Sequence, residues 1–123
     1  MTQNLRPISV TLLAWLYIAV GAIGFIAHFT EIHASNIFRF DGIWIEVVEV
    51  LAIICGVFLL RGRNWARWLA IAWMAFHVAV SAYGPARELV IHSVLFVAFT
   101  WILYRAAAAQ YFRGARIEAE KEQ

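Results

Sequence analysis

The sequence predicts an all-α integral membrane protein, an antiparallel up-down bundle of four transmembrane helices. Hydrophobic residues make up 63% of the chain and charged residues 15%, whereas a soluble domain is about half apolar and about a quarter charged. The mean hydropathy is +0.73. A chain of 123 residues also has too little interior to hide this much apolar surface from water. Lipid is the solvent that accounts for both observations, and we expect one domain over residues 1–123.

The apolar residues fall into four runs separated by polar segments. The predicted spans are residues 8–29, 43–60, 65–83 and 87–104, followed by a charged tail over residues 105–123. The helix of the fourth span is expected to continue through residues 106–112. The first run covers roughly 33 Å at about 1.5 Å per residue, enough for a bilayer core with some tilt. No A-x-A cleavage site follows this run, so we interpret it as an uncleaved first span.

Three connections join the spans. The longest, residues 30–42, alternates the apolar residues Ile37, Phe38 and Phe40 with polar ones. It is predicted to be an irregular or one-turn interfacial segment, with its aromatic side chains at the level of the lipid head groups. Asp41 is expected to cap the second span at its N-terminus. A basic turn over residues 61–64 leads into the third span, and Gly84 with Pro85 ends it.

The distribution of Lys and Arg predicts the orientation of the bundle. Only Arg39 and Arg87 lie on one side. The other side holds eight basic residues: Arg6, Arg61, Arg63, Arg67, Arg105, Arg113, Arg116 and Lys121. Because cytoplasmic segments are enriched in Lys and Arg, both termini of this multi-pass chain are expected to be cytoplasmic.

Polar residues gather in the outer half of the predicted bundle. Glu46 and Glu49 lie roughly 5 and 9 Å inside the outer end of the second span, at about 1.5 Å per residue. His77 and His92 lie at similar depths in the third and fourth spans, and His28 lies at the outer end of the first. Ionisable residues inside hydrocarbon are costly, and they indicate a functional site or a buried partner.

Glu49 and His77 are the predicted partners within this cluster. A carboxylate and an imidazole side by side stabilise one another. The least costly arrangement turns both groups inward and joins them by a hydrogen bond. We therefore expect contact between the second and third spans at these two positions.

Three interpretations of the cluster stay open. It holds the helices in register through hydrogen bonds worth about 1 kcal/mol each. Alternatively, it binds a ligand or a metal, with Glu49, His77 and His92 as the candidate metal ligands. The third interpretation is a proton relay, or a pocket for a lipid or quinone head group, formed by Glu46, Glu49, His77, His92 and His28.

No cofactor is predicted from the spacing, although metal and haem remain alternatives. Carboxylate-bridged di-metal bundles need Glu-x-x-His on two helices, whereas this chain has E-x-x-E at 46–49 and E-x-x-x-H at 88–92. Haem needs two histidines far enough apart to hold the ring between them. His28 and His77 suit that purpose best, because the first and third helices lie diagonally opposite in an up-down bundle.

Three segments carry a resemblance to known proteins. They are R-P-I-S-V-T-L-L-A-W-L-Y at 6–17, R-G-R-N-W-A-R-W-L-A at 61–70 and Y-F-R-G-A at 111–115. Together they resemble a group of small bacterial inner-membrane proteins with four predicted spans, and the general pattern is similar to the DoxX-like membrane proteins. The resemblance implies the span count and a bacterial inner-membrane location, and it transfers no activity.

The sequence thus predicts a small non-enzymatic accessory or interaction subunit, whose Glu/His cluster packs the bundle or binds a small ligand. The alternative is a redox, metal-handling or haem-handling membrane protein that uses the cluster as ligands. One cysteine excludes an intrachain disulfide, and no nucleotide-binding or hydrolase motif is present. The expected partners are the lipid bilayer and a second copy or a larger membrane complex. Nucleic acid is not expected.

Overall fold

The computed structural model describes residues 5–35 and 40–122, and the side chains of residues 5–30 and 43–122. Every regular element in this part of the chain is a helix, so the predicted all-α class is confirmed. The elements are α1 (Ile8–Ser35), α2 (Phe40–Leu60), α3 (Asn64–Ser81), α4 (Ala86–Tyr104) and α5 (Ala106–Lys121).

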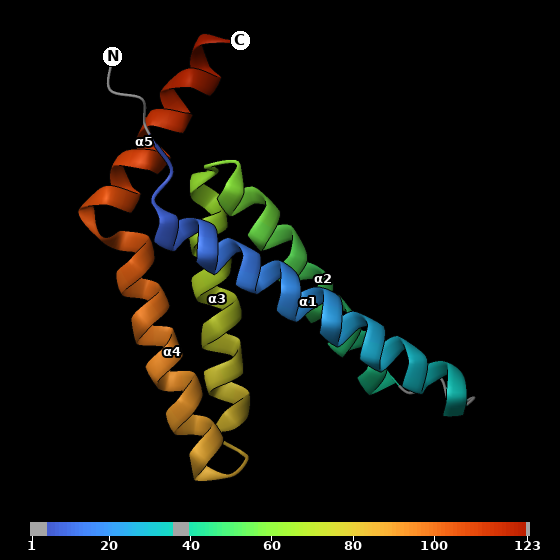
Figure 1. The fold of residues 1–123 in the computed structure, drawn as a ribbon. Coiled ribbons are helices and arrows are strands. Elements are labelled where there is room, and N and C mark those ends of the chain that lie inside the picture. The colour runs from blue at the N-terminus through green and yellow to red at the C-terminus, as the bar shows by residue number, and fades with distance from the viewer. Residues whose placement is uncertain (1–4, 36–39, 123) are drawn as a thin grey trace.

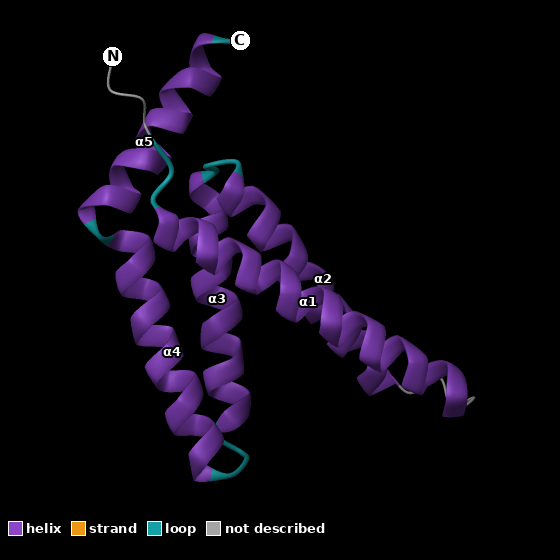
Figure 2. Cartoon of the chain, viewed as in Figure 1, coloured by secondary structure: helices purple, strands orange, loops and turns teal. Residues whose placement is uncertain are grey.

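The first four helices form two hairpins, with α1 beside α2 and α3 beside α4 (Figures 1 and 2). The hairpins meet where α1 begins and where α2 turns into α3, which we call the closed end. From there they diverge, and their far ends form the open end (Figure 1). The packing between hairpins is therefore concentrated at the closed end.

The bounds predicted for the first connection, residues 30–42, are wrong at both ends. Helix α1 continues to Ser35, because residues 30–35 include neither Gly nor Pro to stop it. Helix α2 already begins at Phe40, so Asp41 lies inside that helix and does not precede it as a cap. The predicted interfacial residues Ile37 and Phe38 lie outside the described residues.

Three segments are long and apolar enough to cross a membrane: Ile8–Thr30, Ile43–Leu60 and Ala86–Tyr104. Helix α3, which covers residues 65–81 of the predicted third span, is not among those found in the described part of the chain. Its three tryptophans, Arg67 and His77 lower its hydropathy. Large apolar side chains cover the outer faces of the spans, as shown by Ile23 at 69% and Val97 at 66% exposure. These faces fit a lipid bilayer.

Two glycines bring α1 and α2 into backbone contact. A Cβ atom at Gly21 would lie 2.6 Å from the backbone oxygen of Glu49. At Gly56 it would lie 2.5 Å from the backbone oxygen of Ala14. Real Cβ atoms do not approach this closely, so the hairpin requires glycine at both positions. Small residues permit the same close approach of helices in membranes generally.

The buried core joins the two hairpins at the closed end. The Tyr17 hydroxyl of α1 donates a 2.8 Å hydrogen bond to the backbone oxygen of Ala70 in α3. The Tyr17 ring centroid lies 5.2 Å from that of Trp73 and 5.8 Å from that of Phe99 in α4. Trp73 Nε1 in turn donates a 2.9 Å bond to the backbone oxygen of Val48 in α2. Tyr17 and Trp73 thus connect all four helices.

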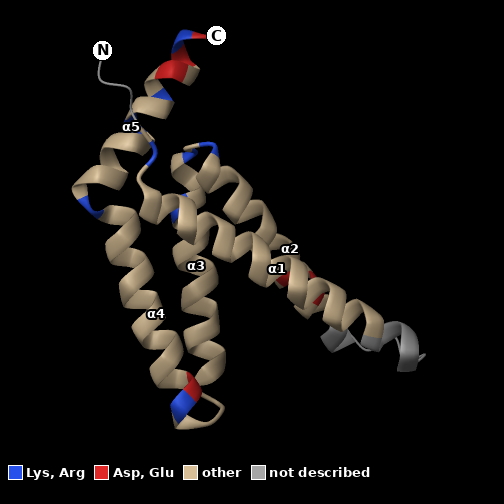
Figure 3. Cartoon of the chain, in the orientation of Figure 1, with Lys and Arg blue, Asp and Glu red and all other residues tan. Residues whose placement is uncertain are grey.

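Helix α5 packs against the closed end, where most of the Lys and Arg residues gather (Figure 3). It is separate from α4 because the backbone of Arg105 is extended, with ψ 158°. The prediction of one continuous helix from the fourth span into the tail is therefore wrong. Phe112 is buried, and the Tyr111 hydroxyl donates a 2.8 Å bond to the backbone oxygen of Leu60. Burial raises the pKa of Tyr111, which keeps this donor protonated. The tail is therefore part of the packed structure.

We expect Tyr17→Phe to lower the free energy of unfolding by about 1 kcal/mol, because the Ala70 carbonyl loses its donor while the ring stays in place. Unfolding in mixed detergent micelles measures the change. Tyr83→Phe is the matched control, since Tyr83 is 96% exposed. An equal effect of the two substitutions would contradict the proposed link between α1 and α3.

Candidate functional site

The first group of polar side chains lies within the α1–α2 hairpin. The Glu49 carboxylate of α2 packs against Gly24 of α1 so closely that a Cβ atom at Gly24 would overlap it. His28, one turn further along α1, donates from Nδ1 to the backbone oxygen of Gly24 at 3.0 Å. Glycine at position 24 therefore makes room for the carboxylate inside the hairpin.

The carboxylates of Glu46 and Glu49 have oxygens that accept no hydrogen bond from a described residue. Among the described residues, both carboxylate oxygens of Glu46 and Oε2 of Glu49 are buried and have no hydrogen-bond partner. A buried polar atom without a partner costs about 1–3 kcal/mol, and more when it is charged. These oxygens therefore have unused capacity to accept hydrogen bonds.

The second group lies within the α3–α4 hairpin. His77 Nδ1 donates to the backbone oxygen of Trp73 at 2.9 Å, and the two rings are 3.9 Å apart. Ser81 donates to the backbone oxygen of His77 at 2.7 Å and also contacts His92 Nδ1 at 2.6 Å. Which of the two atoms donates in the Ser81–His92 contact depends on the His92 tautomer. A backbone oxygen can only accept, so His77 Nδ1 is a donor, and its Nε2 is an acceptor in the neutral ring.

Two cavities are lined by side chains from both groups, Glu49 from the first and His77 from the second. The groove between α2 and α3, which we call the α2–α3 groove, has a volume of about 600 Å³ and an almost entirely apolar lining that includes Val47, Leu51, Ala72 and Phe76. The inter-hairpin cavity, about 270 Å³, is lined from α1, α2, α3 and α4.

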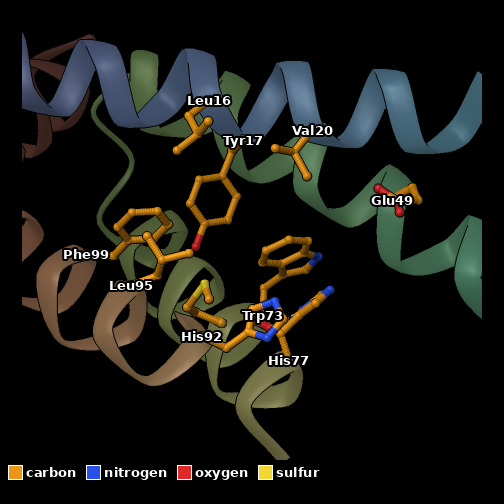
Figure 4. Close-up of a pocket in the computed structure, with 10 residues that line it drawn as sticks. Leu16, Tyr17, Val20, Glu49, Trp73, His77, His92, Leu95 and Phe99 are labelled. Atoms are coloured by element: carbon orange, nitrogen blue, oxygen red, sulfur yellow. Dashed lines mark hydrogen bonds between the residues drawn. The ribbon is translucent and has the colours of Figure 1, made fainter. Parts of the chain in front are cut away.

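Both cavities share three lining residues, Glu49, Trp73 and His77. Figure 4 shows the inter-hairpin cavity, with the Glu49 carboxylate on one side and the imidazoles of His77 and His92 together on another. These three side chains therefore form a wall that both cavities share, and the α2–α3 groove extends from it between the two helices.

The predicted cluster is thus divided between the hairpins. His28, Glu46 and Glu49 belong to one hairpin, and His77 and His92 to the other. The imidazole centroids of His77 and His92 are 5.9 Å apart. Within the described residues, no hydrogen bond or ion pair joins Glu49 to His77 as predicted, because His77 is bonded to its own helix and Glu49 is turned towards α1. His33 lies in α1, but its side chain is outside the described set.

The sequence did not single out Tyr17 and Trp73 as site residues, although the structure places both on the cavity wall. The sequence pattern does indicate both residues, because Tyr17 shares a helix face with Gly24 and Trp73 lies one turn before His77. Aromatic residues on such faces usually pack in a core, and both side chains here also do that.

In the described part of the chain, no group of three or more His, Cys, Asp or Glu side chains is arranged to hold a metal ion. Glu49, His77 and His92, the predicted metal ligands, line one cavity but do not converge on a point. In comparisons with known proteins, no family model, no curated protein and no solved structure matches the chain.

Gly24→Ala is expected to displace the Glu49 carboxylate and to lower the free energy of unfolding by about 2 kcal/mol through overpacking. Adding Glu49→Ala removes the overlap, so the double variant is expected to lose less stability than the sum of the two single losses. A double-mutant cycle of unfolding in micelles measures this coupling. Strict additivity would show that residues 24 and 49 are not in contact.

Proposed function

We propose that this protein is a four-pass protein of the bacterial inner membrane that binds an amphipathic membrane molecule between its two hairpins. It acts as a binding or accessory protein and carries out no chemistry of its own. The observation that supports this function is that Glu49, Trp73 and His77 line both cavities.

The shape and lining of the cavities suit a molecule with a small polar head and an apolar tail. The head enters the inter-hairpin cavity, where Glu49, His77 and His92 supply polar atoms. The tail lies in the α2–α3 groove, against side chains such as Leu51 and Phe76. Ligand sites in proteins commonly combine an apolar lining with a few polar groups that fix orientation.

The proposal includes a membrane crossing by α3. Helix α3 has 18 residues and so spans about 27 Å at about 1.5 Å per residue. It lies beside α4, which is long and apolar enough to cross. The turns at its two ends are at opposite ends of the molecule (Figure 1). Arg67 near its start is buried, and its guanidinium donates to Asn64 at 2.9 Å and lies 4.1 Å from the Tyr104 ring centroid.

We propose that the closed end faces the cytoplasm. It carries most of the basic residues, whereas Arg87 and Glu88 lie at the open end of the second hairpin (Figure 3). Reporters fused at Asn64 and after Gln123 are expected to be cytoplasmic, and a reporter at Gly84 is expected to be on the outer side. If the reporters at Asn64 and Gly84 fell on the same side, α3 would not cross.

Blocking the groove tests the binding function. We expect Ala72→Phe to remove the saturable part of the quenching of tryptophan fluorescence by a brominated decyl amphiphile in nanodiscs, because the larger ring fills the α2–α3 groove. Exposed tryptophans such as Trp15 and Trp101 stay quenched from the lipid in every variant. Ala75→Phe is the control, since Ala72 and Ala75 are both exposed on α3 but only Ala72 lines the groove. Equal quenching in both variants would contradict binding at this place.

The redox or metal-handling alternative is tested on the same preparation. A visible absorbance spectrum and elemental analysis of the purified protein detect haem or bound metal directly. A stoichiometric metal or a haem spectrum would replace the present proposal with the alternative.

A further inference from the structure

We propose that the ligand of the inter-hairpin cavity is a long-chain amine in its ammonium form. This inference rests on the proposed binding function and adds the charge and the hydrogen-bonding character of the ligand. It follows from the polar atoms that the cavity wall presents.

The polar side chains on the wall of the inter-hairpin cavity present acceptors. Tyr17 uses its proton on the backbone oxygen of Ala70, so its hydroxyl has no proton left to donate to a ligand. Trp73 uses its side-chain N–H on the backbone oxygen of Val48. His77 uses Nδ1 as the donor to the backbone oxygen of Trp73, which leaves Nε2 as an acceptor in the neutral ring.

Glu49 completes this set with a buried oxygen that has no partner among the described residues. A ligand that only accepts hydrogen bonds, such as a quinone or an aldehyde, would leave these atoms unsatisfied. An ammonium group has three donors and no acceptor. Its charge also offsets that of the Glu49 carboxylate, and charge-assisted hydrogen bonds are about twice as strong as neutral ones.

The surroundings favour a cation in two further ways. Among the residues that the structure describes, no Lys or Arg lines either cavity, so none of them places a fixed positive charge beside the ligand. Aromatic rings lie beside the site, including Trp73 and Tyr17 on the cavity wall and Trp44 and Phe76 along the groove. The faces of such rings attract cations, most strongly where water is excluded.

The size of the groove indicates the remainder of the ligand. About 600 Å³ of apolar space continues from Glu49 between α2 and α3. In the membrane, a single alkyl chain lies in such a groove in place of lipid tails. The ligand class is therefore a primary amine with one long alkyl chain.

Binding of two matched probes to the protein in nanodiscs tests the inference. We expect the unmodified protein to bind dodecylammonium at least about tenfold more tightly than dodecanol, as a hydrogen bond to a charged group implies. Both affinities are corrected for partition into empty nanodiscs. Glu49→Gln is expected to remove the preference, because it keeps the shape and loses the charge. Glu88→Gln, at an exposed position outside both cavities, is expected to retain it.

The outcomes separate the two proposals. Equal binding of both probes, blocked by Ala72→Phe, would overturn the inference and leave the binding function in place. Binding of neither probe would overturn both. A preference for dodecylammonium that persists in Glu49→Gln would also contradict the assigned role of Glu49. If that variant does not fold, the comparison of the two probes on the unmodified protein still decides whether the ligand is a cation.

Discussion

Gly56→Ala is expected to lower the free energy of unfolding by about 3 kcal/mol, at the upper end of overpacking costs. The added Cβ would meet the backbone oxygen of Ala14 at 2.5 Å. A backbone atom cannot move aside as the end of a flexible side chain can, so α1 and α2 must separate. Gly21→Ala is expected to act in the same way, because its Cβ would meet the backbone oxygen of Glu49. Unfolding in mixed micelles measures both changes.

Gly84→Ala is the control for these substitutions. A Cβ atom there would lie no closer than 3.5 Å to a neighbouring atom, which is ordinary contact, so we expect a change below about 0.5 kcal/mol. If Gly56→Ala and Gly84→Ala changed stability equally, the close approach of α1 and α2 would be wrong.

Phe112→Ala is expected to cost about 3 kcal/mol and to release α5 from the closed end. Phe112 is 1% exposed, and its ring lies under the Arg67 guanidinium at 5.0 Å. Truncation removes a buried aromatic ring and leaves a cavity, for which losses of about 3–5 kcal/mol are typical. Trypsin then cuts faster after Arg113 and Arg116, and the cleavage rate reports the release.

Ile117→Ala provides the comparison for Phe112→Ala on the same helix. Ile117 is 53% exposed, and its truncation is expected to leave the cleavage rate unchanged. Fast cleavage of the unmodified protein at the same sites would show instead that α5 is not docked.

Much of the fold follows from local sequence patterns. Composition and apolar runs predicted the helical class and the segments around α1, α2 and α4, since length and hydropathy are properties of each segment alone. The ends of the first connection were wrong, because polar residues such as Thr30 and Ser35 do not stop a helix without Gly or Pro. The break at Arg105 was also missed, as no local signal marks it. The crossing by α3 stays a prediction.

The candidate site was only partly predictable. Ionisable residues in apolar runs identified Glu49, His77 and His92, and the structure places all three on one cavity. The predicted direct pairing of Glu49 with His77 failed because it depends on how the hairpins diverge. That geometry is fixed by non-local contacts, such as Gly56 against Ala14 and Tyr17 against Ala70, which a single sequence does not reveal.

Photo-crosslinking tests binding between the hairpins most directly. Dodecylammonium carrying a diazirine in its alkyl chain is irradiated with the protein in nanodiscs, and labelled residues are identified by mass spectrometry. The predicted labels lie along the α2–α3 groove, at Leu51, Ala72 and Phe76, and disappear in Ala72→Phe. Equally frequent labels on the exposed side chains of α4, at Val94 and Val97, would show that the amine dissolves in lipid and has no site in the protein.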